Sequence, residues 1–177
     1  MKYVALLRGI NVSGKHSILM KDLKLLFQDL GFENIKTYIQ SGNVVFESKK
    51  KEVSTLSKWI TAKIKEDYNY DIPVIIKTLE EIQAIYDVNP FFTKNVDIKK
   101  LYVVYLSKNP LDVKNLTDCN FKKDTFKIIK NVLYIKYDIG AGKTKLTNSL
   151  VEKKLNVVAT SRNWRTTTKL LEIMVQD

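Results

Sequence analysis

The order of predicted strands and helices repeats once along the chain. In each half, a strand is followed by a helix, two strands, a second helix and a fourth strand. In the first half, apolar runs and alternation predict strands at 2–8, 35–40, 44–47 and 72–77, with helices at 20–30 and 48–67. In the second half, strands are predicted at 101–106, 125–130, 132–137 and 157–160, and helices at 110–117, 145–155 and 166–175. The halves share this order without sharing residues.

Split β-α-β units of this kind form ferredoxin-like domains, in which two helices cover one face of an antiparallel four-stranded sheet. We therefore predict an α+β protein with two β-α-β-β-α-β units and a C-terminal helix. The first unit is expected at 1–77, a helical linker at 78–99 and the second unit with the final helix at 100–177. Thr78 to Glu81 has the form of a capping box, which starts a short helix in the linker. A single mixed sheet is the alternative fold.

Charge and cysteine content limit the classes of function. The formal net charge is +11, from 30 basic and 19 acidic residues. This excess suits an anionic small molecule, an acidic partner or nucleic acid, although a generally solvated lysine-rich surface explains it equally simply. Cys119 is the sole cysteine and His16 the sole histidine, so we predict neither a disulfide nor a metal site. No apolar run is long enough for a membrane span, and we expect a cytoplasmic protein.

Arginine is rare and confined to polar segments of the sequence. Only three basic residues are arginines, and all lie in polar segments that we expect to be loops. The planar guanidinium suits carboxylate or phosphate better than lysine does, whereas the simpler alternative is that each arginine braces its own loop. By ferredoxin-like topology, Arg8–Asn11 should neighbour Ser41–Asn43, and 140–143 should neighbour 161–165. The candidate ligand-binding residues are Arg8, Asn11, Ser41, Asn43, Lys143, Arg162, Asn163 and Arg165.

Two glycine-rich stretches approach the phosphate-binding loop G-x-x-x-x-G-K-[ST]. The first, 9–16, has His16 where a hydroxyl should bind Mg²⁺. The second ends in Gly142-Lys143-Thr144 but has Tyr137 where the first glycine is required. We therefore expect neither to be a true P-loop, although either could hold an anion more loosely.

Two other readings of the second half are weaker. The strand Leu101–Leu106 is similar to the first-strand motif of RNA-recognition modules, but 132–137 lacks the basic-glycine-aromatic pattern of their third strand. An enzyme would have to use Glu152 or Asp138 for acid–base chemistry, since no better candidate exists. The aromatic residues are assigned to the core, with Trp164 left open because it lies between two arginines.

Several segments resemble a bacterial family catalogued as a domain of unknown function. They are Ala5–Val12 (ALLRGINV), Thr37–Phe46 (TYIQSGNVVF), Asn89-Pro90-Phe91, Lys145-Leu146 and Thr160–Thr166 (TSRNWRT), followed by Lys169-Leu170. Ser13 stands where members often carry a glycine. The resemblance covers essentially the whole chain. It implies a paired α+β fold and a shared site, and it implies no reaction.

The leading hypothesis is a cytosolic protein that binds an anionic small ligand, phosphorylated or nucleotide-like, with the arginine-bearing edges of both halves facing one another across a cleft. Substitution of Arg8 or Arg162 by alanine should then abolish binding with little change in stability. An enzyme acting on a phosphorylated or acidic substrate is the second hypothesis, and a nucleic-acid-binding module the third. The sequence names no cofactor and no oligomeric state.

Overall fold

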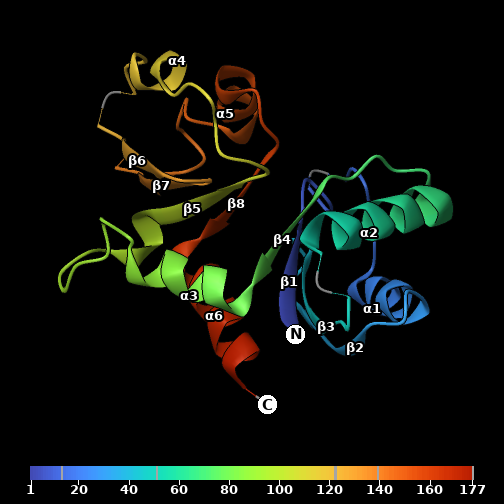
Figure 1. Ribbon diagram of the computed structural model, residues 1–177. Coiled ribbons are helices and arrows are strands. Elements are labelled where there is room, and N and C mark those ends of the chain that lie inside the picture. Colours follow the sequence, from blue (N-terminus) through green and yellow to red (C-terminus); the bar gives the residue numbers. More distant parts are fainter. Residues whose placement is uncertain (13, 51, 122, 139, 177) are drawn as a thin grey trace. The chain divides into compact units, whose positions relative to one another are not determined.

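In the computed structural model the chain forms two four-stranded antiparallel sheets, each accompanied by helices (Figure 1). The structure describes residues 1–177 except 13, 51, 122, 139 and 177. The predicted fold class, two ferredoxin-like units with a C-terminal helix, is confirmed. The chain divides into two compact units, Met1–Ala84 with Lys169–Asp177 and Ile85–Thr168.

The strands and helices follow the predicted order. The first half contains β1 (Lys2–Leu7), α1 (Met20–Asp29), β2 (Glu33–Tyr38), β3 (Asn43–Glu47), α2 (Val53–Tyr68) and β4 (Val74–Thr78). After α3 (Leu79–Asp87) and a 3-10 turn (Ile98–Lys100) come β5 (Leu101–Leu106), α4 (Lys114–Thr117), β6 (Thr125–Ile129), β7 (Val132–Lys136), α5 (Asn148–Leu155), β8 (Ala159–Asn163) and α6 (Trp164–Val175). Within the described part of the chain, no helix is long and apolar enough to cross a membrane.

In the first unit the strand order is β2-β3-β1-β4. The apolar face of this sheet packs against α1 and α2, whose inward residues recur at helical spacing (Figure 1). Tyr3 and Phe46 lie opposite each other on β1 and β3, and their rings stack with centroids 5.6 Å apart. Such cross-strand aromatic pairs stabilise one register, since a slip by one residue would turn them to the other face.

The second unit repeats this arrangement with the strand order β6-β7-β5-β8. Val104 and Leu133 face α4 and α5 and form a core with Leu116, Val151 and Leu155. The opposite face of the same sheet is also buried, because Val103, Tyr105 and Tyr134 are at most 1% exposed. This sheet is therefore covered on both faces.

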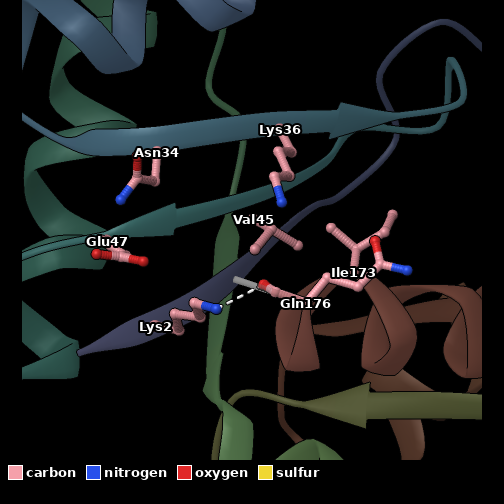
Figure 2. A pocket seen from close by; sticks show the side chains of 7 residues that line it. All are labelled: Lys2, Asn34, Lys36, Val45, Glu47, Ile173 and Gln176. Carbon is pink, nitrogen blue, oxygen red and sulfur yellow. Dashed lines mark hydrogen bonds between the residues drawn. The ribbon is translucent and has the colours of Figure 1, made fainter.

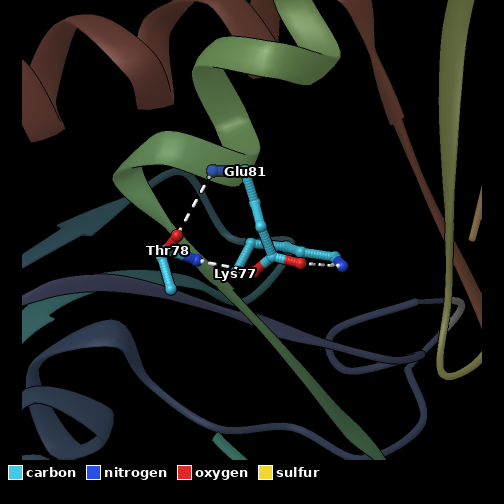
Figure 3. A network of polar contacts seen from close by, with 3 residues as sticks. All are labelled: Lys77, Thr78 and Glu81. Atoms are coloured by element: carbon cyan, nitrogen blue, oxygen red, sulfur yellow. Dashed lines mark hydrogen bonds and ion pairs between the residues drawn. The ribbon is translucent and has the colours of Figure 1, made fainter. Parts of the chain in front are cut away.

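Helix α3 begins with the predicted capping box (Figure 3). The backbone N–H of Glu81 donates to the Thr78 hydroxyl at 3.2 Å, and the Glu81 carboxylate accepts from the Thr78 N–H at 3.0 Å. The other oxygen of Glu81 lies 2.6 Å from the ammonium of Lys77, which is only 3% exposed. Glu81 thus caps the helix and neutralises a buried lysine, a second role that the sequence pattern did not reveal.

Several boundaries differ from the sequence prediction. The second strand, predicted at 35–40, runs from Glu33 to Tyr38, so Ile39 and Gln40 belong to the turn that follows it. Ser48, predicted to cap the second helix, instead accepts from the N–H of Lys50, and the helix starts at Val53 with Glu52 as its N-cap. The final strand, predicted at 157–160, runs from Ala159 to Asn163. Arg162 therefore lies in a strand opposite Val103 of β5, and the expectation that it belongs to a loop is wrong.

Candidate functional site

The two motif segments of the first unit lie side by side, as their topology predicted. The N–H of Leu7 donates to the carbonyl of Gly42 at 2.9 Å. The side-chain amide of Asn11 donates to the carbonyl of Gln40, also at 2.9 Å. We call residues 8–18 and 39–43 together the loop edge. Ser13, named above for its departure from the family motif, lies outside the described residues.

Asn11 holds the loop edge together. Its carboxamide oxygen accepts from the N–H of Ile18 and its nitrogen donates to the carbonyl of Ile18, both at 2.9 Å, in addition to the bond to Gln40. Its backbone is left-handed, with φ of 55°. One side chain therefore fixes both ends of the first loop against the second segment.

Gly42 and Asn43 shape the turn between β2 and β3. Gly42 has φ of +75°, and an added Cβ would lie 2.7 Å from Cδ1 of Ile10 and 2.8 Å from Cβ of Leu7. Only glycine fits this close approach. The buried Asn43 donates from Nδ2 to the carbonyl of Tyr38 and to the hydroxyl of Ser41, each at 2.9 Å. Gly42 and the candidate residue Asn43 therefore fix the conformation of the turn.

Ile39, in the same turn, is strained. Its φ is 47°, in the left-handed region that β-branched residues rarely occupy. Backbone conformations of this kind cost about 1–3 kcal/mol, and they concentrate at functional sites. The side chain is also 49% exposed, so burial of the whole isoleucine does not offset the strain.

The loop edge carries cations and no carboxylate of its own. No Asp or Glu occurs in residues 1–21 or 34–46. Lys15 and His16 are exposed, and Arg8 is half-buried. The ring of His16 packs edge-on against Tyr70, with centroids 5.0 Å apart. Arg8 has interactions of its own within the protein, so a ligand would bind beside or in exchange for them.

In the second unit, Arg162 is buried rather than displayed. The side chain is 7% exposed and donates from Nη1 to the Thr160 hydroxyl at 2.9 Å and to the Ser161 carbonyl at 2.8 Å. Burial lowers the pKa of Arg162 to about 10, so the guanidinium stays charged at neutral pH. On the same face, burial raises the pKa of Tyr105 to about 12, and its hydroxyl lies 3.1 Å from that of Thr167.

The residues after Arg162 cap the start of α6 and pack it against neighbouring aromatic rings. The side-chain oxygen of Asn163 accepts from the N–H of Thr166 at 2.8 Å, as an N-cap does. Trp164 is 1% exposed, stacks on Tyr86 with ring centroids 5.2 Å apart and packs at a tilt against Phe92 at 5.1 Å. The segment following Asn89-Pro90 and the T-x-R-N-W motif thus meet in one aromatic cluster. Arg165 is exposed.

The glycine-rich loop after β7 is held by a residue that the sequence analysis missed. Buried Asp124 accepts from the N–H of Asp138 at 2.9 Å and from the hydroxyl of Thr144 at 2.6 Å. A carboxylate beneath the loop disfavours phosphate, and α5 begins only at Asn148, after the N-cap Thr147. Lys143 is exposed on this loop. The C-terminal ends of β7 and β8 lie at the same end of the sheet, on either side of β5, since Lys136 pairs with Leu101 and Asn163 with Tyr102.

Neither acid–base candidate has a catalytic setting in the contacts that the structure describes. A carboxylate oxygen of Glu152 accepts from the N–H of Ala159 at 2.9 Å, and Asp138 lies 3.8 Å from the ammonium of Lys100. Among the described residues, no group of three or more His, Cys, Asp or Glu side chains is placed to hold a metal ion.

A separate groove in the first unit combines both signs of charge. Figure 2 shows this groove of about 130 Å³, lined by Lys2, Asn34, Lys36, Val45, Glu47, Ile173 and Gln176. The ammonium of Lys2 donates to the carbonyl of Gln176 at 2.6 Å, just beyond the end of α6. Because Lys2 already serves a carbonyl and Glu47 lines the same groove, this place suits an anion less well than the loop edge.

Comparison with known proteins identifies relatives without assigning an activity. A search of curated proteins found no match. The structure is similar to that of the conserved bacterial protein SP0830 from Streptococcus pneumoniae, with a TM-score of 0.77, 22% sequence identity and coverage of 98% of both chains. At this identity the likeness supports the fold alone. The family model for proteins of unknown function called DUF1697 matches residues 1–134. The chain therefore belongs to the DUF1697 family.

Proposed function

We propose that this protein is a cytoplasmic binding module that recognises an anionic ligand, phosphorylated or nucleotide-like, at the loop edge of the first unit. The observation that carries the proposal is the joining of two motif segments by Asn11, next to a turn held in a strained conformation. Strain at an exposed turn is expected where a surface must be pre-formed for recognition. Arg8, Asn11, Ser41 and Asn43 are the residues of this site.

The charge of the loop edge favours an anion. Lys15 is exposed and Arg8 partly so, in two segments that contain no acidic residue. Gly9, Asn11, Gly14 and His16 all have positive φ. The N–H groups of Asn11 and Lys15 already donate within the loop, so recognition of the anion falls to the cationic side chains. Asn11 and Asn43 act indirectly in this proposal, by holding the loops in shape.

The second unit supplies less support. Lys143 and Arg165 are exposed cations there, whereas Arg162 and Asn163 make contacts within their own strand and helix start. The sequence-based prediction that these four residues bind the ligand is therefore not carried into the proposed site. No described contact favours the enzyme or the nucleic-acid hypothesis over binding of a small anion.

The test is a thermal-shift series on the native protein with orthophosphate, pyrophosphate, AMP and ATP at low salt. A ligand that binds only the native state raises the melting temperature. Arg8→Gln and Lys15→Gln should reduce the shift, whereas Arg165→Gln, an equal loss of charge in the second unit, should leave it unchanged. The proposal fails if no compound raises the melting temperature, or if Arg165→Gln has the same effect as Arg8→Gln. A response that disappears steeply with salt and is strongest for an oligonucleotide would instead support nucleic-acid binding.

A further inference from the structure

Three exposed aliphatic residues lie next in sequence to Asn11 and to its two hydrogen-bond partners. Val12, Leu19 and Ile39 are 57%, 53% and 49% exposed. Val12 follows Asn11 directly, Leu19 follows Ile18 and Ile39 precedes Gln40, and both Ile18 and Gln40 are hydrogen-bonded to the Asn11 amide. The three residues therefore belong to segments that the Asn11 amide holds together. We call them the aliphatic patch.

From this arrangement we infer that the loop edge docks an acidic segment of a partner protein, whose aliphatic side chains contact Val12, Leu19 and Ile39 while its carboxylates face Lys15 and Lys21. The inference rests on the proposed function, because it uses the same cationic loop edge, and it adds the carboxylates of a protein segment to the phosphorylated or nucleotide-like ligand proposed above. Lys15 and Lys21 are exposed, and no acidic residue occurs between positions 1 and 21. Charge complementarity thus selects an acidic partner.

The chemistry of the patch disfavours other occupants. Single-stranded nucleic acid is held by aromatic side chains on which bases stack, and the patch offers only aliphatic ones. Membrane-surface segments combine basic residues with Trp, Phe or Leu along one helix face, whereas Val12 and Leu19 come from the loop between β1 and α1 and Ile39 from the turn between β2 and β3. A second copy of this chain would bring another net charge of +11 to a basic surface. An acidic segment with aliphatic residues meets both the charge and the apolar character.

The strained backbone of Ile39 supports a role for its side chain in contacting a partner protein. Asparagine accepts the left-handed backbone more readily than isoleucine does. A residue chosen for folding alone would therefore be polar here, at a half-exposed turn position. An isoleucine at this backbone position is explained if its side chain is buried by a partner.

The experiment measures fluorescence anisotropy of a labelled synthetic peptide composed of leucine, glutamate and serine, with a second peptide of equal charge in which serine replaces each leucine. The leucine-containing peptide should bind the native protein, and the serine peptide about fivefold or more weakly. Ile39→Asn and Val12→Ser should each weaken the leucine peptide by about fivefold. Leu25→Ser, which removes a comparably exposed leucine of α1 outside the patch, should have no effect.

Vesicles of phosphatidylglycerol and oligothymidylate serve as competing probes. Binding of either one in place of the peptide, with the same sensitivity to Ile39→Asn, would overturn the inference. Equal binding of the two peptides, or indifference to both patch substitutions, would do the same. If no peptide binds but pyrophosphate still raises the melting temperature, this inference falls and the proposed function stands. If neither has an effect, both fall. Ile39→Asn is expected to remain folded, so its loss of binding cannot be ascribed to unfolding.

Discussion

Arg8 and Arg162 occupy similar sequence surroundings and different structural ones. Each follows a strand-like apolar run and was expected in a polar loop, Arg8 before Gly9 and Arg162 before Asn163. Arg8 comes directly after β1 and is half-buried at the start of a loop. Arg162 lies inside β8, is 7% exposed and bonds to its own strand. The comparison teaches that in this chain an arginine inside a strand is buried as a brace, whereas one just past the end of a strand stays partly exposed.

The largest expected effect concerns the glycine that joins the loop edge. Gly42→Ala forces a side chain into a left-handed position and against Ile10 and Leu7, so we expect destabilisation of about 2–5 kcal/mol. Gly140→Ala is the matched control in the second unit. It shares the positive φ but meets no atom within 4 Å, and its effect should be about 1–2 kcal/mol. Urea unfolding checks both, and equal losses would show that the close packing of the loop edge has no structural importance.

The next largest loss of stability is expected from removing the buried Arg162. Arg162→Ala loses two hydrogen bonds from a charged, buried group, and we expect destabilisation of about 2–4 kcal/mol. This differs from the sequence-based expectation of a small change, because the burial of Arg162 was not foreseen. Arg165→Ala removes an exposed arginine nearby in sequence and should change stability by less than about 0.5 kcal/mol. A small effect of Arg162→Ala on the melting temperature would restore this arginine as a binding candidate.

The buried face that holds Arg162 should also make stability sensitive to alkaline pH. Burial raises the pKa of Tyr105 from 10.0 to about 12. Between these values the unfolded chain has lost the tyrosine proton while the folded chain keeps it, so stability falls as pH rises. The contribution is at most about 2–3 kcal/mol. The urea midpoint should drop less steeply over this pH range in Tyr105→Phe, and an unchanged slope would assign the alkaline loss to other groups.

The smallest expected effect has the opposite sign. Ile39→Asn relieves a left-handed β-branched residue and should raise stability by about 0.5–1 kcal/mol, after allowance for the apolar contact that it removes. Ile98→Asn replaces another partly exposed isoleucine, without positive φ, and should give no gain. Thermal melts of the two variants make the comparison. A loss of stability in Ile39→Asn would mean that packing of the isoleucine outweighs its strain.

Sequence reasoning recovered the element order because alternation, helical spacing and turn glycines act over a few residues. It recovered the neighbourhood of Arg8 and Ser41 because that follows from topology. It ended the last strand at residue 160 instead of Asn163, since Ser161, Arg162 and Asn163 have low strand propensity and are in the strand because they pair with β5. It also missed Asp124, whose partners lie 14 and 20 residues away and form no local motif. The strain at Ile39 depends on backbone angles that no sequence pattern reported.

Mapping of backbone amide shifts by NMR during titration with pyrophosphate tests the contrast between the two arginine motifs most directly. The account predicts shifts confined to the loop edge, residues 8–18 and 39–43, with none around Arg162. Shifts centred on 140–143 and 162–165, with the loop edge unaffected, would contradict it.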